Sequence, residues 1–440
     1  MKNDMTQGNI VKVLVLFTVP LILSGLFQQL FNWVDAFIVG NVEGELALGG
    51  IGATTALYNL FVTTIVGFTS GVSILAAQKY GMGKKEELKG ILSSFLCLLG
   101  GSFFIIALIG IAFADSILMT LDTPAEIFSI GKEYLQILFM GVPFLAVYNT
   151  YSAVLRGLGD SRAPFLSVLV CSGMNLVLDI LFVVIFRYGA AGAAVATVMS
   201  QVGMTAFVIL YAIKKYPLLR FRMNKKMLNF SVLKSGTKLS LPSAVQSGSS
   251  SIGSLILQRF MNGFGEQTVA AITTAYRVDM VLILPIVNFG SGIATVAAQN
   301  TGAGNSERAR RTLKIGVFMI AAISLCLTGL ILVAGGYLIA MFGLNPESVQ
   351  IGKDFFRAIA SCYIVYGLVM AIRGYLEGTG DMFFSGVTGI VGLGVRIAAS
   401  YAFAGRFGNM VIAYAEALSW AFLLVVYFLR FQVLCRRQPE

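Results

Sequence analysis

The chain has 440 residues, of which 57% are hydrophobic and only 12% are charged, with a net charge of +11. A soluble domain has roughly a quarter of its residues charged, so this composition excludes an ordinary soluble fold. The sequence contains no histidine. Its absence removes the commonest metal ligand and the usual proton carrier near neutral pH, and it leaves any proton chemistry to carboxylates.

Apolar runs long enough to cross a bilayer recur along the whole chain and predict an all-α membrane protein with twelve spans. The spans are expected at residues 12–40, 46–78, 90–114, 132–155, 163–186, 189–213, 236–262, 267–299, 311–342, 354–376, 383–405 and 409–431. Lysine and arginine gather in alternate connections, of which KKYPLLRFRMNKK at 214–226 is the most basic. This asymmetry predicts that both termini lie in the cytoplasm, and it explains the basic charge without nucleic-acid binding.

An internal repeat with an offset of 221 residues divides the chain. GFTSGVSILAAQKYGMG at 67–83 matches NFGSGIATVAAQNTGAG at 288–304, and LRGLGD at 155–160 matches LEGTGD at 376–381. Each half contains six spans, an even number, so the two halves have the same orientation. Parallel repeats of this kind are typical of transporters, although a repeat can also be purely structural.

The repeat predicts an organisation of two lobes. The N-lobe is expected at residues 1–213 and the C-lobe at 236–440, with a basic cytoplasmic linker at 214–235. The glycine-rich ends of the repeated stretches do not have the arrangement of a phosphate-binding loop, so they are interpreted as helix ends and close helix contacts.

The order of the motifs resembles the multidrug and toxic compound extrusion (MATE) family. The resemblance rests on LFTVPLILSGLFQQLFNWVDAFIVG at 16–40, YNTYSAVLRGLGD at 148–160 and MNLVLDILFVV at 174–184, together with the repeated stretches. It covers essentially the whole chain. It implies a V-shaped bundle of two lobes that expels organic cations or other amphiphiles in exchange for protons or sodium ions.

Three polar residues in apolar spans are expected at similar depth in the first half. Asp35, Asp179 and Thr197 each lie roughly 8 to 12 Å below the outer end of their spans, at about 1.5 Å per residue. Asn175 precedes Asp179 by one helical turn and shares its face. An ionisable residue in hydrocarbon is costly and normally has partners in a cavity, so this layer is a candidate site. A purely structural pair of acids is the alternative.

The resemblance assigns a role to this layer. In the DinF-type branch of the family, a span-1 aspartate and a span-5 Asn-xxx-Asp form the ion-coupling network, which matches Asp35, Asn175 and Asp179. Thr197 fits a span-6 member, and Asn149 in span 4 is a further candidate. The coupling ion would be a proton, or sodium bound by oxygens of Asp35, Asp179, Asn175 and Thr197, and no cofactor is expected.

Two carboxylates close together in a low dielectric cannot both stay charged, so the pair is expected to hold a proton or a cation. Exchange requires that the carboxyl pair binds either a proton or a cation, but not both at once.

The second half lacks these acids. At the repeat offset, the counterpart of Asp35 is Ile256 or Leu257, Asn175 corresponds to Arg396, and Asp179 to Ser400. The carboxylate chemistry is therefore expected in one lobe only, and the sodium site of the NorM-type branch, with acids in spans 7 and 10, is not expected. The charged residues in or near C-lobe spans are Arg259, Arg277, Asp279, Arg396 and Glu416. Arg277 and Asp279 are interpreted as a structural pair, and Arg396 is expected to contact an acidic group.

Three other functions remain as alternatives. A flippase of lipid-linked sugars would place several arginines in its central cavity to hold pyrophosphate. An enzyme would need a nucleophile and base, or a metal motif, neither of which the sequence contains. A passive channel would conduct without saturation.

The expected partners are drug-like small molecules and the lipid bilayer of a bacterial or archaeal plasma membrane. The chain is expected to be a monomer.

Overall fold

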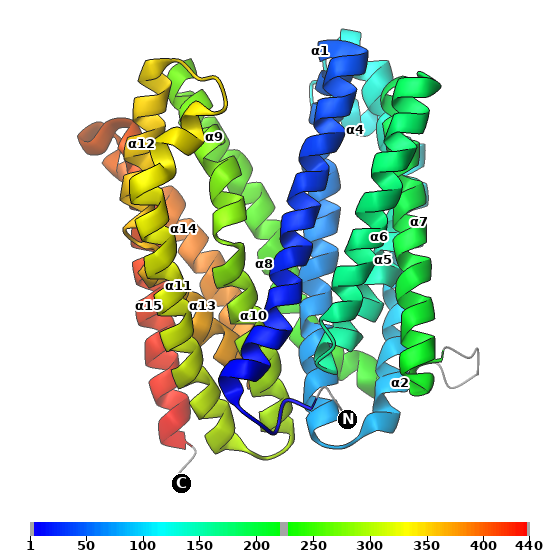
Figure 1. The fold of residues 1–440 in the computed structure, drawn as a ribbon, viewed down its shortest axis with the longest axis vertical. Helices are drawn as coiled ribbons and strands as arrows, with labels where there is room; N and C mark the ends of the chain where they lie inside the picture. Colours follow the sequence, from blue (N-terminus) through cyan, green and yellow to red (C-terminus); the bar gives the residue numbers. More distant parts are fainter. Residues whose placement is uncertain (1–3, 221–227, 438–440) are drawn as a thin grey trace. The chain divides into compact units, whose positions relative to one another are not determined.

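The computed structural model describes residues 4–220 and 228–437, which form helices and contain no strand in these ranges (Figure 1). The α-helices are α1 (Ile10–Gly81), α2 (Lys85–Phe95), α3 (Gly101–Ala112), α4 (Ala114–Thr120), α5 (Ala125–Gly157), α6 (Arg162–Asp179), α7 (Gly189–Lys215), α8 (Phe230–Asn262), α9 (Glu266–Leu282), α10 (Leu284–Gly302), α11 (Ser306–Ala340), α12 (Pro346–Ala360), α13 (Tyr363–Gly378), α14 (Met382–Phe407) and α15 (Val411–Arg437). The remaining elements are two π-helical segments, η1 (Leu96–Gly100) and η2 (Ile180–Ile185), and two 3-10 turns, η3 (Pro217–Leu219) and η4 (Gly408–Met410).

Every predicted span coincides with a helix or a pair of helices, which confirms the all-α membrane fold. In the described part of the chain, eight helical stretches are long and apolar enough to cross a membrane, or ten if two bent pairs each count as one span. The long helix α1 contains the first two predicted spans, separated at Gly44, whose φ of +81° is readily adopted by glycine. The chain is therefore a multi-pass membrane protein.

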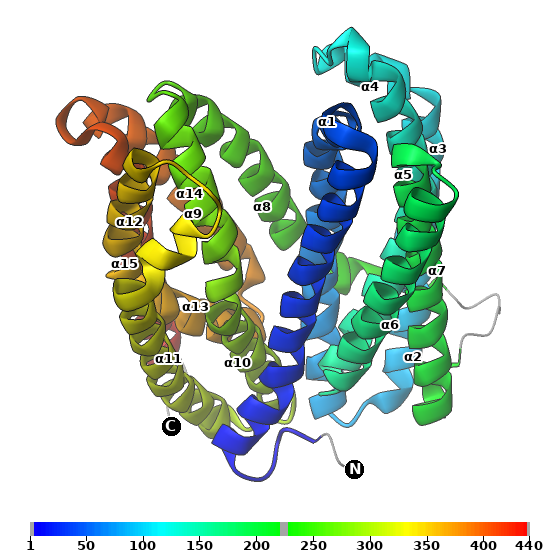
Figure 2. The same cartoon turned by 45° about the horizontal axis from the view of Figure 1, so that its top comes forward.

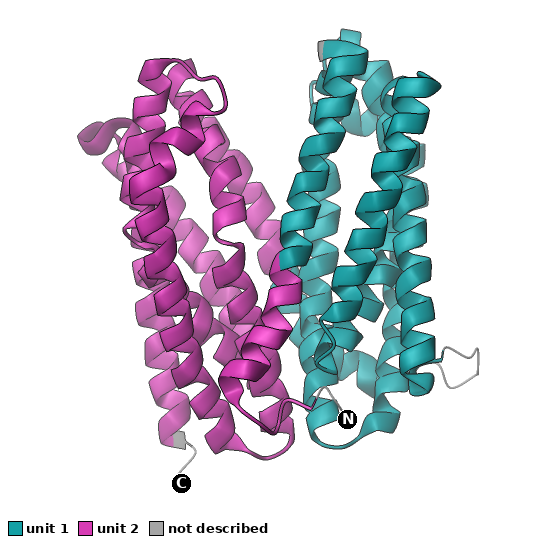
Figure 3. Cartoon of the chain, in the orientation of Figure 1, with its two compact units in different colours: residues 1–3, 23–244 teal, residues 4–22, 245–440 magenta. Residues whose placement is uncertain are grey.

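The contacts divide the chain into two compact units (Figure 3). Unit 1 comprises Leu23–Ala244, and unit 2 comprises Asp4–Ile22 together with the residues from Val245 on. This division differs from the predicted lobes at two places, because the start of α1 belongs to unit 2 and the start of α8 belongs to unit 1. Within the predicted linker 214–235, residues 221–227 lie outside the described part.

Specific contacts explain where the units divide. The Met5 backbone N–H donates to Gln299 Oε1 at 3.1 Å, which ties the segment before α1 to α10 of unit 2. In unit 1, a Cβ atom on Gly71 would lie only 2.6 Å from the backbone nitrogen of Ser240. The glycine thus allows α1 and the first part of α8 to approach closely, as small residues do between membrane helices.

The repeated glycine motifs make the same contact in both units. A Cβ atom on Gly157 of LRGLGD would lie 2.7 Å from Ala76 Cβ, and one on Gly378 of LEGTGD would lie 2.8 Å from Ala297 Cβ. Both pairs are related by the offset of 221 residues. The repeat in the sequence therefore corresponds to a repeated close packing of α5 on α1 and of α13 on α10.

A buried aspartate fixes the turn after α5 to the end of α7. Asp160 is 2% exposed, and its Oδ2 accepts hydrogen bonds from Lys215 Nζ at 2.7 Å, Tyr216 OH at 2.8 Å and Tyr211 OH at 3.2 Å. Its Oδ1 accepts from the backbone N–H of Arg162 at 3.2 Å, at the start of α6. Burial raises the pKa of Tyr216 above its ordinary value, so its hydroxyl stays protonated and remains a donor.

Replacing Asp160 with asparagine is expected to destabilise unit 1 by about 1 to 3 kcal/mol, because three donors lose a charged acceptor. The thermal unfolding midpoint of the purified protein in detergent measures this change. The matched control is Asp115→Asn, which removes a partly exposed ion pair with Lys132 at 2.8 Å and is expected to cost less than about 1 kcal/mol. Equal shifts for both variants would contradict the assigned role of Asp160.

Candidate functional site

Four of the predicted site residues lie together in unit 1, where α5, α6 and α7 run side by side (Figures 1 and 2). Asp35 comes from α1, Asn175 and Asp179 come from α6, and Thr197 comes from α7. Asp179 is the last residue of α6, and the π-helical segment η2 follows it directly. Such π-helical turns occur frequently at functional sites.

The two carboxyl groups face each other. Asp35 and Asp179 are within side-chain hydrogen-bonding reach of one another. Asp179 is fully buried and Asp35 is half-buried. Oδ1 of each is buried and has no donor partner in the described part of the chain. A hydrogen bond between two carboxyl groups requires a proton on one of them, so a shared proton would satisfy both.

Asn175 links the carboxyl pair to α7. With its amide nitrogen directed at Asp179 Oδ2, it donates a hydrogen bond to that carboxyl, and its amide oxygen accepts from the Thr197 backbone N–H at 3.2 Å. The Thr197 hydroxyl lies 3.4 Å from the same amide. Because Asn175 is 1% exposed, these contacts hold its side chain in one orientation beside Asp179.

Asn149, the fifth predicted member, is bound elsewhere. It is buried on α5, and its Nδ2 donates to the Leu145 carbonyl one turn earlier at 2.9 Å. In the described residues it makes no hydrogen bond to Asp35 or Asp179. A role in the site therefore remains a prediction for Asn149.

Two tyrosines and a glutamine extend the site beyond the predicted residues. Tyr134 of α5 is buried within electrostatic range of Asp35, Asp179 and Tyr58. Gln201 of α7 donates from Nε2 to the Tyr58 hydroxyl at 2.7 Å. Tyr134 lies near the end of its span, where a tyrosine normally indicates an interfacial anchor, so no local pattern indicates that it adjoins the carboxyls.

The charged residues of the second half form a different arrangement. Arg396 Nη2 contacts Glu416 Oε2 at 2.8 Å, which confirms the expected acidic contact of Arg396. The predicted pair of Arg277 and Asp279 is wrong. Arg277 is exposed, whereas Asp279 is buried and accepts a hydrogen bond from the Tyr363 hydroxyl. Residues two apart on a helix point to different faces, which explains the difference.

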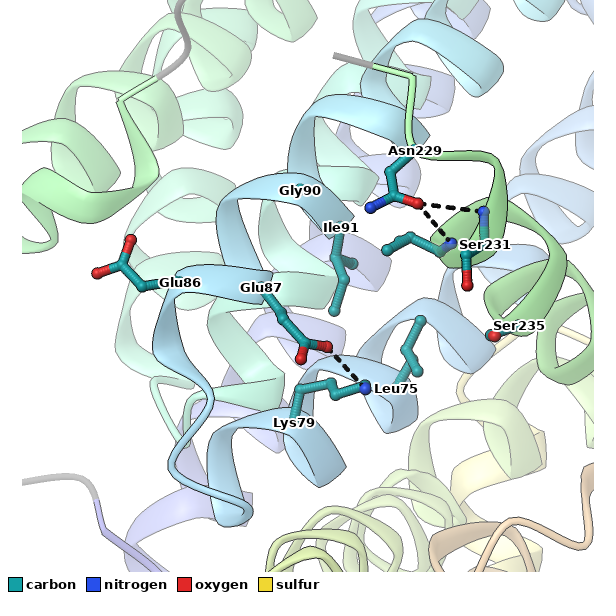
Figure 4. A pocket seen from close by; sticks show the side chains of 10 residues that line it. Leu75, Lys79, Glu86, Glu87, Gly90, Ile91, Asn229, Ser231 and Ser235 are labelled. Carbon is teal, nitrogen blue, oxygen red and sulfur yellow. Dashed lines mark hydrogen bonds and ion pairs between the residues drawn. The ribbon is translucent and has the colours of Figure 1, made fainter. Parts of the chain in front are cut away.

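A pocket of about 540 Å³ lies apart from the carboxyl pair, at the ends of α1, α2 and α8 (Figure 4). It is lined by Leu75, Lys79, Glu86, Glu87, Gly90, Ile91, Asn229, Ser231, Val232 and Ser235. Lys79 Nζ pairs with Glu87 Oε2 at 2.7 Å, and Asn229 Oδ1 accepts from the backbone N–H of Ser231 at 3.1 Å as a cap of α8. None of the predicted site residues lines this pocket, so it is separate from the carboxylate site.

Comparison with known sequences gives matches to both halves of the chain. Residues 20–181 and 242–402 match the MatE family model. Probable multidrug resistance protein YpnP of Bacillus subtilis is 31% identical over 385 residues, which cover 86% of this chain and 85% of that protein. Multidrug export protein MepA of Staphylococcus aureus is 21% identical over 431 residues, which cover 96% of this chain and 95% of that protein.

Comparison with solved structures gives the same fold. A structure described as the outward-facing conformation of a multidrug resistance MATE family transporter of the MOP superfamily has a TM-score of 0.93 at 21% identity, with 100% of this chain and 99% of that chain covered. A MOP superfamily transporter from Pyrococcus furiosus has a TM-score of 0.92 at 22% identity, with coverage of 100% and 99%. Because the family model matches most of the chain in two copies, the chain belongs to the MatE family of multidrug and toxic compound extrusion transporters.

Proposed function

We propose that the chain is a secondary active multidrug efflux transporter that exchanges organic cations or amphiphilic drugs for protons across the plasma membrane. The observation that carries the proposal is the close approach of the carboxyl groups of Asp35 and Asp179 in unit 1. Relatives named as multidrug resistance and export proteins support drug-like substrates. The distribution of lysine and arginine supports cytoplasmic termini. The proposed transporter works as a monomer, catalyses no covalent step and needs no cofactor.

The carboxyl pair acts as the exchange site. Two ionised carboxylates in contact within a low dielectric repel each other, so the pair holds a proton while no other cation is present. Release of that proton leaves a negative site that attracts a cationic substrate. Since proton and cation compete for the same charge, each expels the other, and exposure of the site to alternate sides of the membrane completes the cycle.

Asn175 and Thr197 position the pair. The Asn175 amide donates to Asp179, and its oxygen is held by the Thr197 backbone N–H at 3.2 Å. The carboxyl of Asp179 therefore keeps its orientation towards Asp35 in both protonation states. The same oxygens are of the type that binds sodium. The close approach of the two carboxyls nevertheless favours the proton, because sodium held by both would require both to be ionised.

The coupling ion is tested with the wild-type protein in liposomes. A pH gradient and a sodium gradient are imposed separately while efflux of a fluorescent organic cation is followed. We expect the pH gradient alone to drive efflux, with up to about a tenfold substrate gradient per pH unit for each proton exchanged. Efflux driven only by sodium would overturn proton coupling. Failure of both gradients, with transfer of a lipid-linked sugar instead, would identify the flippase alternative.

A further inference from the structure

A buried hydrogen bond joins two bent spans of unit 2 next to their breaks. Helices α9 and α10 are bent by 42° at Ile283, and α12 and α13 are bent by 47° at the break after Ala360. Asp279 lies in the last turn of α9, and Tyr363 is the first residue of α13. The Tyr363 hydroxyl donates to Asp279 Oδ1, with Asp279 6% and Tyr363 0% exposed. Broken membrane helices in transporters frequently surround binding sites for ions or substrates.

The ion pair of Arg396 and Glu416 lies next to this hydrogen bond. Arg396 of α14 contacts Glu416 of α15 at 2.8 Å, and the hydroxyl of Tyr276 on α9 donates to Glu416 Oε2 at 2.9 Å. The same hydroxyl accepts from Arg396 Nη2 at 2.7 Å. Asp279 is within electrostatic range of both Arg396 and Glu416. The Nε of Arg396 is buried and has no hydrogen-bond partner among the described residues.

The charges of this cluster do not balance if Asp279 is ionised. Arg396 already neutralises Glu416, so a charged Asp279 would leave one net negative charge among buried groups. An ionised carboxylate without its own cation is expensive inside a membrane protein. The ligand that removes this charge without needing space is a proton.

Among the described residues, Arg396 is the cation whose charge acts on Asp279. Arg373 of α13 is paired with Glu377 at 2.7 Å. On α9 itself Arg277 is exposed, and on α12 Arg357 is exposed while Lys353 lies against Gly336 of α11. Helix α10 has no charged residue, and the charged residues of α11 lie in its first nine positions. The remaining titratable groups that face Asp279 are Tyr276, Tyr363, Tyr366, Arg396 and Glu416.

We propose that Asp279 is a second proton-binding centre, built at the two helix breaks of unit 2 and separate from the carboxyl pair of Asp35 and Asp179. Protonation neutralises the cluster, and ionisation strengthens the acceptor that Tyr363 binds. The hydrogen bond between the two bent spans thus changes with the proton. At the repeat offset, Arg396 occupies the position that Asn175 has in unit 1, so the polar centres of the two units lie at related places in the repeat.

Trp420 provides a reporter that does not depend on transport. It is one turn from Glu416 on α15, is 8% exposed, and its ring lies 4.7 Å from that of Tyr366. The chain has two tryptophans, so Trp33→Phe leaves Trp420 as the single one. The emission of this full-length variant in lipid nanodiscs is titrated from mildly acidic to mildly alkaline pH. We expect one reversible transition.

The transition is assigned with variants in the Trp33→Phe background. Asp279→Asn is expected to remove it, whereas Asp35→Asn, which alters the site in unit 1, and Glu347→Gln, which removes an exposed acid, are expected to retain it. If Asp279→Asn does not fold, Tyr363→Phe serves instead. It is expected to move the midpoint to higher pH, because the carboxylate loses a hydrogen-bond donor.

Three results would overturn the proposal. The first is that the parent variant shows no transition. The second is that Glu416→Gln loses the transition while Asp279→Asn retains it. The third is that Asp35→Asn loses the transition. The readout measures proton binding in unit 2 without a substrate. A failed titration would therefore leave the proposed efflux function standing, and a failed efflux assay would leave the proton centre standing.

Discussion

Asp35→Asn and Asp179→Asn are each expected to abolish drug efflux driven by a pH gradient in liposomes. Asparagine retains the shape of the side chain but can neither share the proton nor carry the negative charge that attracts a cation. One pH unit supplies about 1.4 kcal/mol per exchanged proton, so loss of coupling should reduce the maximal substrate gradient at least about tenfold per pH unit. Efflux of a fluorescent organic cation measures the change.

The matched control for this prediction is Glu126→Gln, because Glu126 is an exposed acid in the first turn of α5 in the same unit. It should transport at the rate of the wild type. Thermal unfolding of every variant separates loss of coupling from loss of fold. If Asp35→Asn and Asp179→Asn both transport normally under a pH gradient, the carboxyl pair is structural and the proposed exchange site is wrong.

Gly157→Val and Gly378→Val are each expected to destabilise their unit by about 3 kcal/mol or more. The added Cβ alone would lie 2.7 Å from Ala76 Cβ in unit 1 and 2.8 Å from Ala297 Cβ in unit 2. The facing atoms belong to the backbone and to short side chains, which cannot rotate away. The helices would therefore have to separate. The yield of monodisperse protein and its thermal unfolding midpoint in detergent measure the effect.

The controls for this prediction are Gly101→Val and Gly329→Val, at helical glycines where an added Cβ would have no neighbour within 4 Å. Because valine has a higher helix propensity than glycine, these variants should change stability by less than about 1 kcal/mol. Equal losses at contact and control positions would contradict the role assigned to the close packing of Gly157 and Gly378.

The sequence by itself determined the class and organisation of the protein. Hydrophobicity is a local property of the chain, so the composition and the apolar runs were sufficient to predict each span. The offset of 221 residues also placed Gly157 and Gly378 at equivalent positions, and both make the same close helix contact. Part of the candidate site could be predicted from the sequence for the same reason. Asn175 and Asp179 share a face through their spacing, and the depth of Asp35 follows from its distance to the end of the span.

Only the tertiary structure decided which distant helices meet, and at which face. The depth of a residue follows from counting along a span, but the rotation of a helix about its axis depends on its neighbours. For this reason Tyr134 could not be assigned to the site, and Asp279 was paired with Arg277 when its partner is Tyr363. The division into units has the same origin. The start of α1 belongs to unit 2 because the backbone of Met5 bonds to Gln299, a contact between residues 294 apart that no local pattern encodes.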